Sequence, residues 1–185
     1  KKFHADVQAL GTSLLKQGLV GESRLAIVAE SRYEWYVSYL SGMNGGIVMV
    51  PIDNELQTEE LASLFNRSLC DAIIYSPRFA DKVETAAKTV PTLRQLILMN
   101  DLGFASGKND EDDNKEIEKR DLEFISDAGK CISILLWNDL LRDGKKAILE
   151  GDRRFTEIDI DPDKLAVLLF TSGTTDRSKC VMHSH

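Results

Sequence analysis

The fold is decided by residues 25–52, LAIVAESRYEWYVSYLSGMNGGIVMVPI. Leu25–Ala29 and Ile47–Ile52 are short, continuous apolar runs, which is the pattern of strands buried on both faces. Between them, Ser31 and Glu34 have the Ser-x-x-Glu spacing of a capping box, and this spacing predicts the start of a helix. Two glycines end that helix just before the second run. A strand, a helix and a second strand in direct succession predict a parallel pair with a right-handed helical crossover.

The same alternation continues on both sides of this stretch. The apolar spacing and the capping residues predict a helix from Phe3 to Leu15, a helix capped by Thr58, a strand at 72–75, a helix capped by Ser76 with Pro77 in its first turn, and a strand at 96–99. Residues 1–100 therefore form a repeating β-α unit. We predict the α/β class, with a parallel sheet flanked by helices on both faces.

The pattern changes after residue 100. Residues 101–130 are polar, with four consecutive acids at 110–113, and we predict a loop or insertion there. These acids lack the glycine and the terminal glutamate of a calcium loop. Residues 131–163 form a connecting segment with a strand at 132–136 and a short helix through Leu140 and Leu141. Residues 164–185 contain the last strand and the loop that follows it.

Composition excludes several classes of protein. The chain is 43% hydrophobic and 29% charged, and it contains no run of about 20 apolar residues that would span a membrane. The net charge of −7 argues against a nucleic-acid partner. Cys70, Cys131 and Cys180 are few, widely separated and outside any zinc spacing, so we expect reduced thiols in a cytoplasmic protein.

A hydroxyl-rich loop follows the apolar run at 165–170, which we interpret as a fully buried strand. In a parallel sheet the carboxyl end of a strand is where ligands bind. The loop's hydroxyls, its glycine and its backbone N–H groups suit phosphate oxygens, and Lys179 adds a positive charge. The spacing is not that of a Walker loop, and an ordinary Ser/Thr-rich turn remains the alternative. The candidate phosphate-binding residues are Thr171, Ser172, Gly173, Thr174, Thr175 and Lys179.

This stretch resembles the signature of the adenylate-forming superfamily, which includes acyl-CoA synthetases, luciferases and nonribosomal peptide adenylation domains. The resemblance rests on the order of strand, Thr-Ser-Gly-Thr-Thr, lysine and the trailing Val-Met-x-Ser-His at 181–185. Segments 21–27, 34–35 and 45–53 are also similar to the family, so the likeness covers nearly the whole chain apart from the acidic segment. The sequence departs from the family at three positions, where Asp176, Ser178 and Cys180 replace the usual Gly, Pro and Gly.

The resemblance implies that residues 1–185 are an incomplete N-terminal domain of the adenylate-forming fold. In that family a carboxylate attacks the α-phosphate of ATP, with Mg²⁺ sharing the charge. Coenzyme A then displaces AMP from the acyl-adenylate. The six loop residues named above would hold the β- and γ-phosphates, and the family's catalytic residues lie beyond this fragment. The resemblance thus implies a fragment of an acyl-CoA ligase, with fatty acids as substrates, that is inactive alone.

Two other functions stay open at this stage, namely an adenylation domain for amino or aryl acids and a non-catalytic α/β module that binds a nucleotide or a partner. We also expect the fragment to self-associate, because its last strand would normally sit inside a larger sheet. His183 and His185 are expected at a helix start, where residues two apart do not share a face, so no metal site is predicted. Trp35 is expected to pack its helix, and Cys180 to be a small packed side chain.

Overall fold

The computed structural model describes residues 1–99, 123–171 and 178–185. Within these ranges the helices are α1 (Lys2–Lys16), α2 (Tyr33–Asn44), α3 (Thr58–Ser68), the 3-10 turn η1 (Pro77–Phe79), α4 (Ala80–Ala87) and α6 (Trp137–Leu149). The strands are β1 (Arg24–Val28), β2 (Val48–Pro51), β3 (Ala72–Tyr75), β4 (Gln95–Leu98), β5 (Glu123–Ile125), β6 (Cys131–Leu136), β7 (Leu165–Thr171) and β8 (Lys179–Ser184). The acidic run at 110–113 lies outside the described residues.

The strands of the described ranges form one sheet in the order β5-β6-β4-β3-β1-β2-β7-β8. Strands β6, β4, β3, β1, β2 and β7 run parallel, which confirms the predicted parallel sheet. Both outermost strands, β5 and β8, pair antiparallel instead. The short connections explain this, because a parallel neighbour needs a crossover of about a dozen residues or more. At the β5–β6 turn, for example, the Ser126 N–H donates to the Lys130 carbonyl at 2.9 Å.

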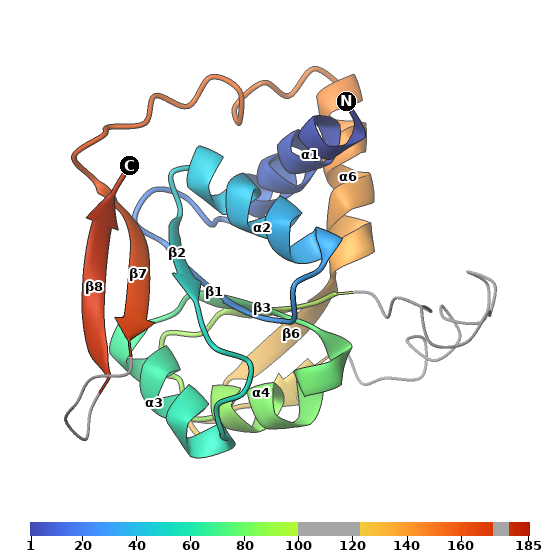
Figure 1. Cartoon of the computed structure of the whole chain (residues 1–185). Coiled ribbons are helices and arrows are strands. Elements are labelled where there is room, and N and C mark those ends of the chain that lie inside the picture. Colours follow the sequence, from blue (N-terminus) through green and yellow to red (C-terminus); the bar gives the residue numbers. More distant parts are fainter. Residues whose placement is uncertain (100–122, 172–177) are drawn as a thin grey trace.

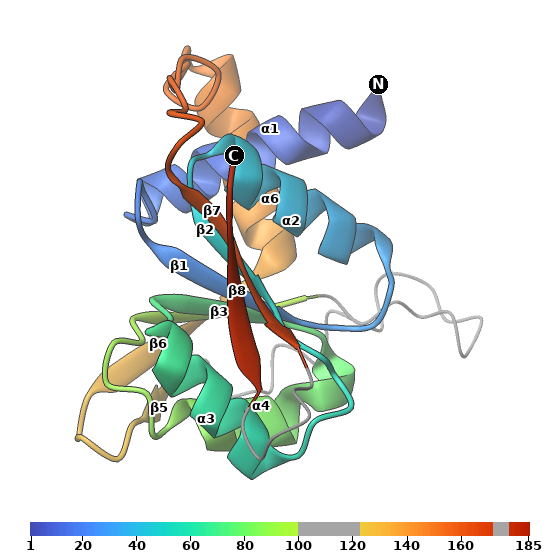
Figure 2. The same cartoon turned by 60° about the vertical axis from the view of Figure 1, so that its left-hand side comes forward.

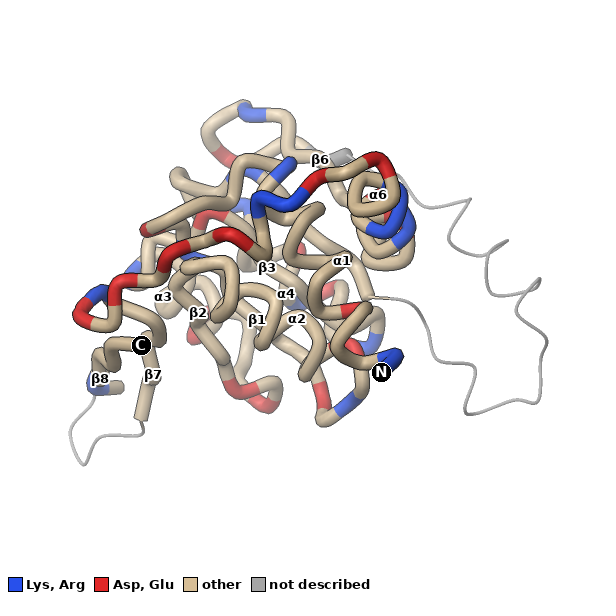
Figure 3. Tube along the Cα trace, turned by 90° about the horizontal axis from the view of Figure 1, so that it is seen from above, with Lys and Arg blue, Asp and Glu red and all other residues tan. Residues whose placement is uncertain are grey.

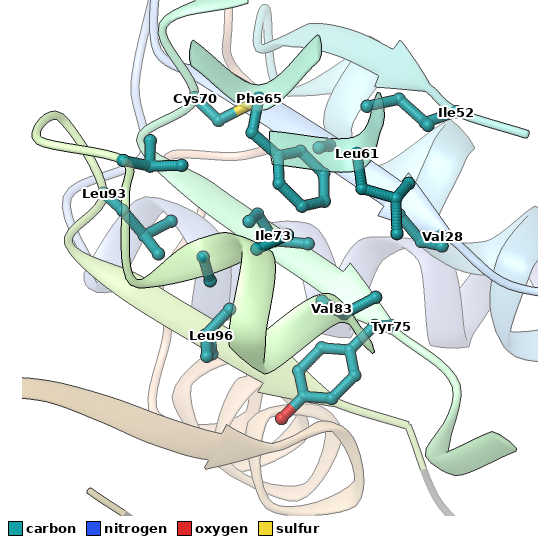
Figure 4. Close-up of a cluster of buried hydrophobic side chains, with 14 of the residues drawn as sticks. Val28, Ile52, Leu61, Phe65, Cys70, Ile73, Tyr75, Val83, Leu93 and Leu96 are labelled. Carbon is teal, nitrogen blue, oxygen red and sulfur yellow. The ribbon is translucent and has the colours of Figure 1, made fainter. Parts of the chain in front are cut away.

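Helices cover both faces of the sheet, as predicted (Figure 1). Helices α1, α2 and α6 lie on one face, and α3 and α4 lie on the other (Figures 1 and 2). Successive side chains of a strand point to opposite faces, so Ile74 joins the core under α1 while Ile73 and Tyr75 join the core under α3 and α4. In that second core, Phe65 of α3 packs toward β3 (Figure 4). Among the described residues, no helix combines the length and apolarity that crossing a bilayer requires.

The start of α2 differs from the prediction. The residue that precedes the helix is Arg32, and it makes no side-chain cap, so the predicted capping box of Ser31 and Glu34 is wrong. Glu34 is 5% exposed, and its carboxylate accepts a hydrogen bond from Arg32 Nε at 2.8 Å. Glu34 therefore serves a buried ion pair with Arg32, two residues before it, and not the predicted cap.

Of the next two predicted helix caps, one is wrong and one is confirmed. The N-cap of α3 is Gln57 and not the predicted Thr58, which is already helical. The Gln57 N–H donates to the Glu60 carboxylate at 3.1 Å, so the acidic first turn serves the helix start. The predicted cap at Ser76 is confirmed, since its hydroxyl accepts from the Arg78 N–H at the start of η1.

Helix α6 is the main feature of the segment 131–163. The predicted short helix through Leu140 and Leu141 extends over 13 residues and packs along α1. The Trp137 indole N–H also donates to the Ser38 hydroxyl of α2 at 2.9 Å, in the interior. Helix α6 therefore contacts both α1 and α2. After α6 the chain returns over the molecule, without a regular element, to the start of β7 (Figure 1).

Candidate phosphate-binding edge of the sheet

The two described ends of the hydroxyl-rich loop lie opposite each other. Thr171 is the last residue of β7 and Lys179 is the first of β8, and the two are paired in the antiparallel register. Strands β7 and β8 run side by side (Figures 1 and 2). Two of the six predicted site residues are thus brought together. The other four, Ser172, Gly173, Thr174 and Thr175, lie outside the described residues, as does Asp176.

Thr171 lies at the edge of the sheet where ligands bind in α/β folds. Strand β7 runs parallel to β2, so its end lies on the same side of the sheet as the carboxyl ends of the other parallel strands. Open α/β sheets bind ligands at this edge because the loops after the strands meet there. Strand β8 brings the positive charge of Lys179 to this edge. Elsewhere in the molecule, Lys and Arg positions gather along α6 and the segment after it (Figure 3).

A buried ionic network occupies the same edge at the ends of β1 and β3. Arg32 is 7% exposed, and its guanidinium contacts Glu34 at 2.8 Å, Glu30 at 3.3 Å and the Ser76 hydroxyl at 3.2 Å. The Ser76 hydroxyl donates in turn to Glu30 at 3.1 Å. This network was not predicted from the sequence, where its signal is the Glu-Ser-Arg-x-Glu run directly after a buried strand. The network joins the loop after β1 to the loop after β3.

Arg67 is a second residue that sequence analysis did not find. It extends from the last turn of α3, and its Nη2 donates to the carbonyl oxygen of Ser178 at 2.8 Å. Its guanidinium carbon also lies 5.2 Å from the centre of the Phe170 ring. A hollow of about 580 Å³ lies between α3 and Ser178 beside this contact. The contact joins residues 111 positions apart, so no local pattern could have indicated it.

Burial along β7 and β8 is lower than predicted. The run 165–170 was expected to be fully buried, but only Ala166, Val167 and Leu168 are, and the remaining residues are half-buried. Strand β8 is exposed along its whole length, so the expectation that Cys180 is a packed side chain is wrong. The cause is the position of β8 at the outer edge of the sheet, where no further strand of the described chain covers it.

The residues after the loop form a strand and not the expected helix start. His183 belongs to β8, while His185 lies beyond it and donates its N–H to the Lys164 carbonyl at 3.3 Å. Across the described ranges, no group of three or more His, Cys, Asp or Glu side chains is arranged to hold a metal ion. Trp35 packs as expected, since it lies against the core and stacks on Tyr39 at 5.2 Å between ring centres.

The architecture is that of the N-terminal part of an adenylate-forming domain. The chain superposes, with a TM-score of 0.77, on the A-PCP didomain of carboxylic acid reductase from Segniliparus rugosus, which was solved in complex with AMP. The aligned region covers 98% of this chain and 25% of that chain, at 18% sequence identity. At this identity the likeness shows the fold, and it confirms the predicted fold class.

Sequence similarity assigns the chain to a family. All of residues 1–185 match the sequence model of the AMP-binding enzyme family, and the chain belongs to this family. It is 28% identical over 192 aligned positions to the long-chain-fatty-acid–CoA ligase 5 of Mus musculus, covering 100% of this chain and 24% of the relative. It is 26% identical to the 3-methylmercaptopropionyl-CoA ligase of Ruegeria pomeroyi, covering 97% of this chain and 28% of the relative. The chain therefore spans about a quarter of the length of these relatives.

Proposed function

We propose that this chain is the N-terminal portion of an ATP-dependent acyl-CoA ligase whose substrate is a fatty acid. One observation carries the proposal: Thr171 and Lys179 are paired at the carboxyl edge of a parallel sheet in a chain of the AMP-binding family. A hydroxyl and an ammonium group at that edge suit the oxygens of a triphosphate. The relationship to long-chain-fatty-acid–CoA ligases supports the acyl substrate.

In this proposal the loop holds the β- and γ-phosphates, and Lys179 offsets their charge. The donors are those of Thr171, Ser172, Gly173, Thr174, Thr175 and Lys179. An oxygen of the substrate carboxylate then bonds to the α-phosphorus, and the bond to the bridging oxygen breaks, which releases pyrophosphate. In the second step the coenzyme A thiol gives up its proton to solvent, its sulfur bonds to the acyl carbon, and the bond from that carbon to the phosphate oxygen breaks, which releases AMP. The loop's task is positioning and charge neutralisation, and Mg²⁺ would be bound together with the triphosphate.

The proposal assigns no catalysis to the 185 residues alone. The chain spans about a quarter of its relatives, so the groups that bind the acyl chain and coenzyme A belong, in this proposal, to the remainder of a longer enzyme. We also propose a cytoplasmic location, because the three cysteines are few and widely separated in the sequence.

Titration of the chain with Mg-ATP, followed by calorimetry, tests the phosphate-binding function. Lys179→Ala should weaken binding about ten- to a hundredfold, since a charge-assisted contact contributes roughly 1.5–3 kcal/mol. Lys164→Ala is the matched control, because this exposed lysine precedes the opposite end of β7 and its loss changes the net charge equally. Equal binding by the two variants would exclude Lys179 as a phosphate ligand.

A pyrophosphate-release assay tests the second part of the proposal. The chain is mixed with ATP, Mg²⁺ and a long-chain fatty acid, and no release above the rate without protein is expected. A measurable turnover that depends on the fatty acid would show that the chain is catalytic by itself.

A further inference from the structure

We propose that Arg67 is a positioning residue that holds both ends of the phosphate-binding loop. This inference rests on the proposed function of the loop, and it adds a residue from a distant part of the chain. Arg67 stands on α3, and one guanidinium group contacts Ser178 through a hydrogen bond of 2.8 Å and Phe170 through its ring face at 5.2 Å.

The two contacts lie beside the two described ends of the loop. Phe170 directly precedes Thr171, and Ser178 directly precedes Lys179. Thr171 and Lys179 are paired across β7 and β8. Arg67 contacts the residue that precedes each of them, so it is in contact with the chain at both members of this pair. The guanidinium thereby restrains the spacing of the two residues that begin and end the phosphate contacts.

The residue at position 178 does not by itself fix the backbone at this end of the loop. A proline at this position would fix its own φ near −65°. Ser178 lacks that restriction, so its peptide group has more freedom. A hydrogen bond from a helix to the Ser178 carbonyl supplies a restraint from outside the loop. Arg67 thereby supplies the kind of restraint that a proline at position 178 would give.

The helix that bears Arg67 is well suited to this role. Leu64 and Phe65 anchor its last turn in the core, and the Ser68 hydroxyl donates back to the Leu64 carbonyl at 2.7 Å. The Arg67 side chain itself is exposed, so its replacement leaves the core unchanged. Arginine can stack on a ring and donate a directed hydrogen bond at once, because its guanidinium is planar. Lysine keeps the charge but loses this combination.

The test compares Arg67→Met and Arg67→Lys with the wild-type chain in Mg-ATP titrations. We expect both variants to bind ATP about five- to tenfold more weakly, with an unfolding midpoint like that of the wild type. Adding Ser178→Pro to Arg67→Met should recover most of the affinity. Arg78→Met is the matched control, because Arg78 also stacks on a ring, that of Phe79 at 5.7 Å, on another segment of the chain. Wild-type affinity for ATP in Arg67→Lys would overturn the inference, since the positive charge alone would then suffice. A failure of Ser178→Pro to restore binding in Arg67→Met would also overturn it.

Amide hydrogen exchange separates this inference from the proposed function. Exchange at residues 169–171 and 178–181 should accelerate in Arg67→Met and stay unchanged in Arg78→Met, with no nucleotide present. If the wild-type chain does not bind ATP but the exchange accelerates, the proposed function fails while the restraint on the loop ends stands. If the wild-type chain binds ATP and Arg67→Met changes neither affinity nor exchange, the inference about Arg67 fails alone.

Discussion

Gly144 of α6 lies directly against Ala9 of α1. A Cβ atom on Gly144 would stand 1.8 Å from the carbonyl oxygen of Ala9, well inside any permitted contact. The two helices approach this closely because the position carries no side chain. The contact is part of the layer that covers one face of the sheet, so the fit between these helices supports the whole domain.

Gly144→Ala should therefore lower the free energy of unfolding by about 1–3 kcal/mol, the usual cost of an overpacked interior. This loss exceeds the gain of up to about 1 kcal/mol that alanine brings to a helix. Urea denaturation measures the change. Lys146→Ala on the same helix is the control, because its side chain is 74% exposed and its contact with Glu150 is long, at 3.9 Å, so a change within about 0.5 kcal/mol is expected. A Gly144→Ala midpoint at or above the wild-type value would contradict the close approach.

Arg32→Met should destabilise the chain more strongly, by about 3–5 kcal/mol. Methionine fills similar space but leaves the buried Glu34 carboxylate, whose side chain is 6% exposed, without its cation. Thermal unfolding is the measurement. In the control Arg142→Met, the lost pair with Asp139 is exposed and contributes under about 1 kcal/mol. Similar losses for the two variants would show that burial does not set the energy of the Arg32 network.

Tyr33 should make stability sensitive to alkaline pH. Burial, followed by the hydrogen bond that its hydroxyl donates to Asp6 at 2.9 Å, raises the Tyr33 pKa from 10.0 to about 12. The folded state therefore holds the proton more tightly than the unfolded state. The contribution is full below pH 10 and is lost as the pH rises toward 12. From pH 9 to pH 11, the denaturation midpoint should fall less in Tyr33→Phe than in the wild type. Equal pH dependence in the wild type and Tyr33→Phe would refute the coupling.

The three cysteines should differ in reactivity. Cys70 is fully buried, and burial raises the pKa of its thiol to about 12, whereas Cys131 and Cys180 are exposed. Ellman's reagent at pH 8 should titrate two thiols quickly in the native chain and the third only after unfolding. Cys131→Ser and Cys180→Ser should each remove one fast equivalent. Three fast equivalents in the native chain would mean that Cys70 is accessible.

The outer strand β8 predicts self-association. Its outer edge has no neighbouring strand in the described chain, and Met182 is 71% exposed along it. Unpaired edges with apolar side chains tend to pair with another copy. Light scattering at rising concentration should show oligomers, which Met182→Lys should reduce. A clean monomer at high concentration in the wild-type chain would count against the prediction.

The sequence by itself determined the central strands and the chemistry of the loop. Ala72–Tyr75 is buried on both faces, and such strands are continuous apolar runs that can be recognised without knowledge of their neighbours. The hydroxyls of Thr171, Ser172, Thr174 and Thr175 are likewise a property of the chain itself, although the structure describes only Thr171 among them. Ser76 was identified as a cap because its partner is two residues away.

Only the tertiary structure decided the direction of β8, the contact of Arg67 with Ser178, and the approach of Gly144 to Ala9. The residues 181–185 carry no pattern that separates a helix start from an exposed edge strand, and pairing with β7 settles the matter. Arg67 looks locally like any charged residue at the end of a helix. Its role comes from a partner far along the chain, which the folded sheet alone brings within 2.8 Å. Contacts of this kind depend on how layers pack, and packing leaves no periodicity in the segment that makes the contact.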